Sequence, residues 1–131
     1  MKLLLDTHIW VWSLGEPERL KPRVVQALQD PANELWLSPI SVWEFLVLAQ
    51  KKRVSVVGDP FQWVEHAFET LPVHEASLNR EVAVRSRRLM LGHRDPADRF
   101  LAATALVYEL RLVTGDERLL RAKALPLLSN R

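Results

Sequence analysis

Two acidic residues follow predicted strands at positions where a carboxylate can take part in chemistry. Asp6 comes directly after the predicted strand 2–5, and Asp116 comes just after the predicted strand 111–114. Parallel strands that share one sheet end at the same edge, and ligands of open α/β sheets bind beyond that edge. We therefore expect Asp6 and Asp116 to face the same cleft.

Two further acids begin predicted helices. Glu44 lies in the early turns of the helix expected after Ser38-Pro39, within an otherwise apolar stretch, and Asp98 lies in the first turn of the helix expected after Asp95-Pro96. A helix that follows a parallel strand begins at the carboxyl edge of the sheet. An unpaired buried Glu44 would be costly, so a metal or hydrogen-bond partner is expected for it.

Four carboxylates in one cleft predict a hard divalent cation. Ionised carboxylates a few ångströms apart repel one another, and without a cation they protonate or destabilise the fold. Mg²⁺ binds oxygen ligands and typically uses one or two carboxylates with several waters, and Mn²⁺ accepts the same ligands. Such an ion can activate a water and neutralise charge on a phosphoryl oxygen. The hydroxyls of Thr7 and Thr114 are expected to support the acids next to them.

Helix capping alone is an alternative explanation for each of these acids. Asp6 and Asp116 can cap the helices that follow them, and Asp95 with Asp98 resembles a capping box. Ser41 with Glu44 forms the same pattern if its helix starts late. Capping alone leaves unexplained why an acid occurs at nearly every turn that should face one sheet edge.

The elements that must position these acids alternate between strand and helix. This order predicts a single α/β domain over residues 1–131, with a short parallel sheet of about four to five strands covered by helices on both faces. Residues 54–57 are expected to be a short strand or an extended connection. Strands are expected at 2–5, 34–37, 71–73, 111–114 and 125–128, and helices at 7–14, 22–29, 39–52, 60–70, 77–90 and 95–110, with a short helix after Asp116.

Composition excludes several classes of protein. The 131 residues are 48% hydrophobic and 26% charged, which is typical of a globular protein, and no apolar run is long enough to span a membrane. The absence of Cys excludes disulfides, thiolate nucleophiles and Cys-ligated metal centres, and it fits a cytoplasmic location. The four His residues have no metal-ligand spacing, so the sequence argues against zinc.

Charge and aromatic residues bear on a polyanionic partner. Residues 1–79 contain 7 Lys and Arg against 10 Asp and Glu, whereas residues 80–131 contain 11 against 6. The basic second half predicts either nucleic-acid binding or merely Arg-rich solvated helix faces. Arg94 and Arg99 flank the Asp95–Asp98 turn and are candidate phosphate contacts, or ion-pair partners of nearby acids.

Three of the five Trp residues lie near the proposed site: Trp10, Trp12 and Trp43. We expect them mainly in the core or in an interface, and the alternative is that they stack on unpaired bases.

Taken together, these segments resemble the PIN-domain nucleases, and most closely the VapC-type toxins of bacterial and archaeal toxin–antitoxin pairs. The four matching segments follow the family order and span nearly the whole chain. They are Leu3-Leu4-Leu5-Asp6-Thr7-His8, Ser38-Pro39-Ile40-Ser41-Val42-Trp43-Glu44, the segment 93–105 around Asp95-Pro96-Ala97-Asp98-Arg99, and Leu112-Val113-Thr114-Gly115-Asp116.

The resemblance implies a PIN-like three-layer α/β/α fold and an RNA-cleaving toxin that uses Mg²⁺ (or Mn²⁺). In this sequence the family's four acidic positions are Asp6, Glu44, Asp98 and Asp116, and Asp6 and Asp98 match those most often assigned as metal ligands. Asp95 matches an additional acid of one family variant. The resemblance also implies hydrolysis of an RNA phosphodiester bond to give a 5′-phosphate, a cognate antitoxin protein as partner, and a homodimer.

Three other functions stay open at this stage. A catalytically silent RNA-binding or antitoxin-binding module of the same fold would not require all four acids. A response-regulator receiver domain would require adjacent acids after the first strand and a Lys after the last, which the sequence lacks. A DNA-directed structure-specific nuclease usually has additional segments.

Overall fold

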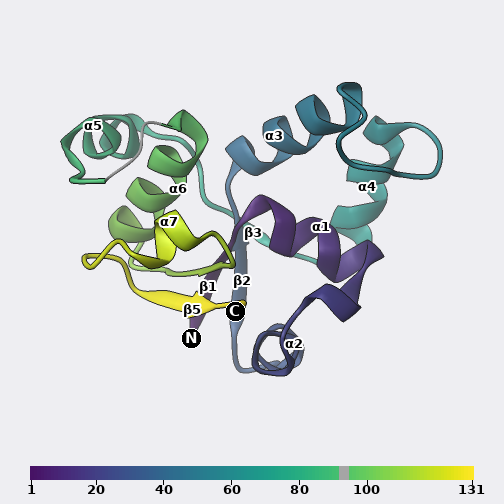
Figure 1. The fold of residues 1–131 in the computed structure, drawn as a ribbon, viewed down its shortest axis with the longest axis horizontal. Helices are drawn as coiled ribbons and strands as arrows, with labels where there is room; N and C mark the ends of the chain where they lie inside the picture. The colour runs from purple at the N-terminus through teal and green to yellow at the C-terminus, as the bar shows by residue number, and fades with distance from the viewer. Residues whose placement is uncertain (92–94) are drawn as a thin grey trace.

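The computed structural model describes residues 1–91 and 95–131, and its centre is a five-stranded parallel sheet with the order β3-β2-β1-β4-β5 (Figure 1). The central strand β1 pairs with β2 on one side and with β4 on the other, with Leu4 opposite both Trp36 and Leu112. The strands are β1 (Lys2–Leu5), β2 (Glu34–Leu37), β3 (His74–Glu75), β4 (Arg111–Thr114) and β5 (Leu127–Ser129).

Helices connect the strands and cover both faces of the sheet (Figure 1). Proline at the first turn and an Asp, Ser or Asn cap begin several of them, as at Ser38 and Asp59. The described helices are α1 (Thr7–Gly15), the 3₁₀ helix η1 (Pro17–Arg19), α2 (Pro22–Gln29), α3 (Pro39–Gln50), α4 (Pro60–Thr70), α5 (Arg80–Arg88), α6 (Pro96–Val107) and α7 (Glu117–Leu120).

The core is divided into two layers by β1. Leu3 and Leu5 pack with α1 to α4, whereas Leu4 points to the other face and packs with α6 and α7. This alternation follows from the two-residue period of a strand, and it explains why β1 is apolar at successive positions. On the first face Trp10 meets Phe45 edge-on at 6.0 Å, so this layer contains an aromatic cluster. The expected three-layer α/β/α arrangement is confirmed.

The strand order creates the switch point that positions the site. The chain leaves β1 to form β2 and then β3 on one side, and it returns through α5 and α6 to form β4 on the other side. Asp6 and Asp116 therefore follow two neighbouring strands that lie on either side of this reversal. Because β3 precedes α5 and α6, helix α6 begins near the carboxyl edge, as the position of Asp98 requires.

Several predicted boundaries are wrong. The strand expected at 71–73 is replaced by β3 at His74–Glu75, since Pro72 lacks the N–H needed for pairing. Helix α5 begins later than residue 77 because Asn79 caps it, and it ends at Arg88 rather than at residue 90. The last strand begins two residues later and ends one residue later than expected. Residues 54–57 form no strand, which leaves the alternative of a connection. Among the described residues, no helix has the length and apolar character that crossing a membrane requires.

Candidate active site

The centre of the site is a hydrogen-bonded unit at the ends of β1 and β4. Thr114 Oγ1 donates to Asp6 Oδ2 at 2.6 Å and accepts from the backbone N–H of Asp116 at 3.0 Å. The backbone N–H of Thr7 donates to Asp6 Oδ1 at 2.7 Å, so Asp6 caps α1 as well. One threonine hydroxyl thus couples the two strand-end acids, which agrees with the expectation for Thr114.

Burial dominates the electrostatics of Asp6. The residue is 8% exposed. This burial raises the pKa of the Asp6 carboxyl above its ordinary value, against the smaller lowering effects of the Thr114 hydroxyl and of His8. The carboxylate is therefore held rigidly in a place that favours its charged form only when a cation is near.

Asp98 reaches the same pocket from the first turn of α6. Asp95 caps this helix by accepting from the backbone N–H of Ala97 at 3.0 Å, and Asp98 is 7% exposed. Burial, followed by the charges of Asp95, Asp6 and Asp116, raises the pKa of Asp98 to about 7. These three acids thus lie close enough to Asp98 for their charges to act on it, which is the expected convergence.

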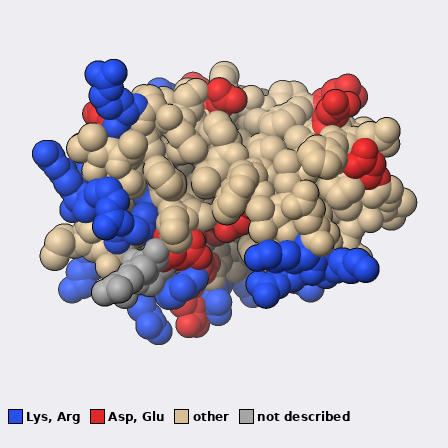
Figure 2. Space-filling view, turned by 90° about the horizontal axis from the view of Figure 1, so that it is seen from above, with Lys and Arg blue, Asp and Glu red and all other residues tan. Residues whose placement is uncertain are grey.

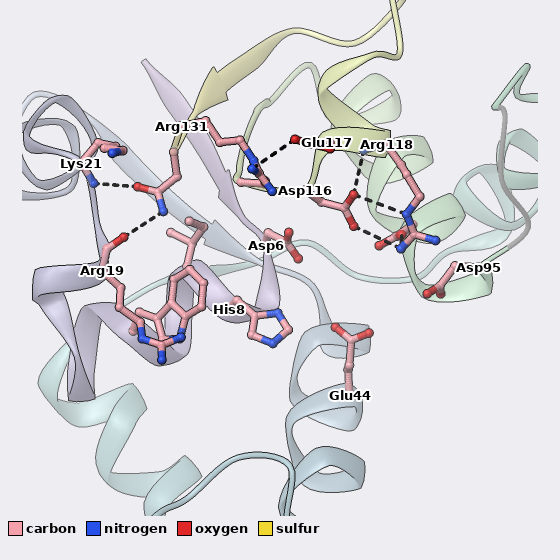
Figure 3. A pocket seen from close by; sticks show the side chains of 15 residues that line it. Asp6, His8, Arg19, Lys21, Glu44, Asp95, Asp116, Glu117, Arg118 and Arg131 are labelled. Atoms are coloured by element: carbon pink, nitrogen blue, oxygen red, sulfur yellow. Dashed lines mark hydrogen bonds and ion pairs between the residues drawn. The ribbon is translucent and has the colours of Figure 1, made fainter.

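Glu44 faces the pocket from the second turn of α3 (Figure 3). It is half-buried rather than enclosed, so the expectation of a buried Glu44 is wrong. Ser38 caps this helix by accepting from the N–H of Ile40 at 3.1 Å, and the capping box of Ser41 with Glu44 does not form. Much of the apolar sequence around Glu44 is explained by Val42, Phe45 and Leu46, which pack in the core.

The four predicted acids line one open pocket of about 1040 Å³. Figure 3 shows Asp6, Asp95 and Asp116 on one side and Glu44 opposite. The rest of the lining includes His8 and four basic residues. Figure 2 shows acidic side chains gathered between basic ones on one margin of the molecule. The lining residues with charged or imidazole side chains are Asp6, His8, Arg19, Lys21, Glu44, Asp95, Asp98, Asp116, Glu117, Arg118 and Arg131.

The donor set fits a hard divalent cation. It consists of carboxylate oxygens, and burial raises the pKa values of Asp6 and Asp98, so a cation in the pocket would favour their charged forms. Within the described residues, no three acidic or His side chains surround a single point as they stand. One or two direct carboxylates completed by waters, as is usual for Mg²⁺, are compatible with this arrangement.

Two other predicted residues, Arg99 and Thr7, do not take the places expected for them. Arg99 donates through Nε to Ser86 O and through Nη2 to Leu89 O, both at 2.9 Å, so its guanidinium holds the end of α5 and is not part of the described pocket lining. The Thr7 hydroxyl is fully buried and, within the described part of the chain, has no hydrogen-bond partner. Arg94 lies outside the described residues. Asp95 combines both of its predicted roles, as helix cap and as pocket residue.

The tryptophans divide between core and pocket. Trp10 is fully buried, as expected. Trp12 lines the pocket, where the Arg19 guanidinium carbon lies 5.1 Å from its ring centroid and the His8 ring lies 5.4 Å away. Trp43 is 58% exposed and is not a core residue.

Sequence reasoning missed the basic wall opposite α6, formed by Arg19, Lys21 and Arg131. Asn130, which is 7% exposed, ties this wall together because its Oδ1 accepts from the Lys21 N–H at 2.7 Å and its Nδ2 donates to Arg19 O at 3.1 Å. The partners are more than 100 residues apart in the chain. No local pattern marks such a contact, although a buried Asn beside the last strand invites a search for its partners.

Residues 3–125 match the PIN domain family, a span that includes all four candidate acids. The chain belongs to the PIN domain family. A curated relative, Ribonuclease VapC22 of Mycobacterium tuberculosis (strain ATCC 25618 / H37Rv), is 35% identical over 118 residues, which cover 89% of this chain and 88% of the relative.

Solved structures support the same fold for this PIN domain. VapBC2 from Rickettsia felis, bound to a DNA fragment from the promoter, superimposes with a TM-score of 0.69 at 16% identity and 98% coverage of both chains. A toxin–antitoxin complex from Klebsiella pneumoniae gives a TM-score of 0.69 at 22% identity, again with 98% coverage of both. At these identities the similarity establishes the architecture, and the assignment of chemistry depends on the pocket.

Proposed function

We propose that this PIN domain is a metal-dependent endoribonuclease that hydrolyses RNA phosphodiester bonds and acts as the toxin of a toxin–antitoxin pair. The observation that carries the proposal is the pair Asp6 and Asp98, two nearly buried carboxylates with raised pKa values in an open pocket. Buried acids of this kind cluster at functional sites. The 35% identical relative is named a ribonuclease, which supports RNA as the substrate.

Asp6 and Asp98 are the proposed metal ligands, with Asp116 and Glu44 completing the site through bound waters. Mg²⁺ or Mn²⁺, when bound, supplies an activated water and neutralises charge on the phosphoryl group. Thr114 orients Asp6 and joins it to the backbone of Asp116, so the strand ends keep two carboxylates at a fixed separation. Such preorganisation lowers the reorganisation required when a cation binds.

The basic wall of Arg19, Lys21 and Arg131 is the proposed path of the RNA backbone. An acidic pocket alone repels a polyanion, and cations on the facing wall offset that repulsion and make binding dependent on salt. Trp12 and His8 lie between this wall and Asp6, where an unpaired base could stack.

The proposal also includes two protein partners and a location. An antitoxin protein is supported by the toxin–antitoxin complexes that share this fold. A homodimer and a cytoplasmic location complete the proposed description. An antitoxin that covers the pocket would need positive charge against its acids.

The central experiment is cleavage of a structured RNA by the purified protein with Mg²⁺ or Mn²⁺, repeated in EDTA. Asp6→Asn and Asp98→Asn should abolish cleavage, whereas Asp30→Asn, an exposed acid that caps only a local turn, should not. Full cleavage in EDTA or in either pocket variant contradicts the assignment. RNA binding without cleavage by the wild type would instead identify a catalytically silent module.

A second experiment, in cells, identifies the RNA that the protein cleaves. Brief expression of the wild type and of Asp98→Asn in a host, followed by sequencing of RNA ends, should give new 5′-phosphate ends only with the wild type. The positions of these ends name the cleaved RNA. Identical RNA ends in the two cultures would contradict the toxin function.

A further inference from the structure

Arg118, the second residue of α7, places its guanidinium between two of the candidate metal ligands. Its Nη2 lies 3.4 Å from Asp98 Oδ2 and 3.3 Å from Asp116 Oδ2. Asp98 belongs to α6 and Asp116 follows β4, so this one nitrogen connects two elements that line the pocket. Figure 3 shows the Arg118 guanidinium beside Asp116.

Arg118 offsets part of the negative charge of the pocket. Burial and three neighbouring acids raise the pKa of Asp98, whereas Arg118 lowers it. The bonds and charge of Asp116 are the main causes that raise the pKa of Arg118. The guanidinium therefore supplies part of the positive charge that clustered carboxylates require.

The geometry also makes this contact easy to break. The guanidinium contacts Asp116 through Nε, 3.5 Å from Oδ1, and through Nη2, 3.3 Å from Oδ2, and the same Nη2 lies 3.4 Å from Asp98 Oδ2. All three distances are longer than the roughly 2.7–2.9 Å typical of strong charge-assisted hydrogen bonds, so each contact is weak. The Arg118 side chain is 53% exposed, so it can move outward into solvent, and a bound cation would then take over the neutralisation of Asp98. It also borders a second hollow of about 520 Å³, which gives it room.

We propose that Arg118 is a built-in counter-ion that occupies the acidic pocket in the metal-free protein and is displaced when a divalent cation binds. The inference rests on the proposed metal site of the nuclease. It makes Arg118 a positioning residue that holds Asp98 and Asp116 together until the cation replaces it. Metal affinity is then set partly by competition with the protein's own side chain.

A purely structural role for Arg118 gives a different result. If Arg118 only fastened α7 to α6, its removal would lower stability equally with and without metal and would leave metal affinity unchanged or weaker. Competition instead requires that the loss of Arg118 tightens metal binding. It also requires that the stability difference disappears once the cation is bound, because the contact is then already broken.

The test is calorimetric titration with Mn²⁺ of the wild type, Arg118→Gln, Arg118→Lys and Arg121→Gln. Arg118→Gln should bind Mn²⁺ about three- to tenfold more tightly than the wild type, because the Arg118 guanidinium no longer has to be displaced. Arg118→Lys retains the charge and should stay closer to the wild type. Arg121→Gln removes the same charge from a side chain that pairs with Glu117 at 3.9 Å, and it should change the affinity less than twofold.

Thermal unfolding provides the second measurement. Arg118→Gln should melt at a lower temperature than the wild type in EDTA and at the same temperature with saturating Mn²⁺. Equal or weaker Mn²⁺ binding by a folded Arg118→Gln overturns this inference and leaves the nuclease proposal intact. A wild type that binds no Mn²⁺ overturns the metal site itself, and the inference with it, so the two failures are distinguishable.

Discussion

The carboxylates at the strand ends and the carboxylate on α3 contribute to one pocket in different ways. Asp6 is 8% exposed, is fixed by a 2.6 Å hydrogen bond from Thr114, and has a raised pKa. Glu44 is half-exposed and, within the described residues, its carboxylate has no hydrogen bond that fixes it. The first group is fixed by the sheet, whereas the second is a longer side chain on a helix.

This difference indicates that the strand-end acids and Glu44 have different roles in ion binding. A strand end inside a parallel sheet has a backbone that neighbouring strands hold on both sides, so a short Asp there has one accessible position. Glu44 has an additional rotatable bond and solvent beside it, so it can adjust to an ion or its waters. The strand-end acids are expected to determine whether the ion binds, and Glu44 how well the site accommodates it.

The largest effect is expected for Asp6→Asn. Loss of this anionic ligand should lower cleavage by roughly 10³-fold or more, as removal of a central catalytic group does. Because burial raises the pKa of Asp6, the neutral variant should unfold in EDTA at pH 8 at a temperature equal to or above that of the wild type. A variant that unfolds earlier would assign Asp6 to folding rather than to ion binding.

Thr114→Val tests whether the hydroxyl orients the acids. This nearly isosteric change removes the bond to Asp6 and the acceptor for the Asp116 N–H, and it should weaken Mn²⁺ binding about 10- to 100-fold. The matched control is Thr104→Val, since Thr104 is equally buried but its Oγ1 donates to Phe100 O at 2.7 Å. Similar Mn²⁺ affinities in the two variants would contradict the role of the Thr114 hydroxyl in orienting the acids.

The buried acids should also make stability depend on pH without metal. The folded protein binds a proton at Asp98 with a pKa of about 7, above the value of 3.8 in the unfolded chain, so the free energy of unfolding falls as pH rises from about 4 to 7. We expect Asp98 to contribute a loss of up to about 4 kcal/mol, since each pKa unit corresponds to about 1.4 kcal/mol, and urea unfolding in EDTA measures this loss. Asp98→Asn should remove this contribution; an identical pH slope in the variant would contradict it.

The smallest effect is expected for Glu44→Gln. If Glu44 adjusts to the ion rather than fixing it, Mn²⁺ affinity and kcat/KM should fall less than about tenfold, because water can replace its contact. Glu65→Gln, on the exposed face of α4, is the matched control. A loss as large as that of Asp6→Asn would show that α3 and the strand ends contribute equally.

The charge of the chain shows how sequence position differs from spatial position. From its excess of Lys and Arg, the second half of the sequence, residues 80–131, is expected to bind nucleic acid or to form Arg-rich solvated helix faces. The structure instead builds one wall of the pocket from Arg19 and Lys21 in the acidic half, joined to the C-terminal segment through Asn130. Arg99, expected to contact phosphate, donates to α5 carbonyls because the end of that helix needs donors.

The sequence by itself determined the α/β class, the parallel sheet and the four acids, because strand runs, helix caps and the residues just after strands are local signals. The tertiary structure decided which of these acids are buried, that Thr114 bonds to Asp6 across 108 positions, and that Arg118 lies between Asp98 and Asp116. Burial and contacts between distant segments depend on how strands pair and helices pack. The local spacing of residues in the sequence does not predict burial or contacts between distant segments.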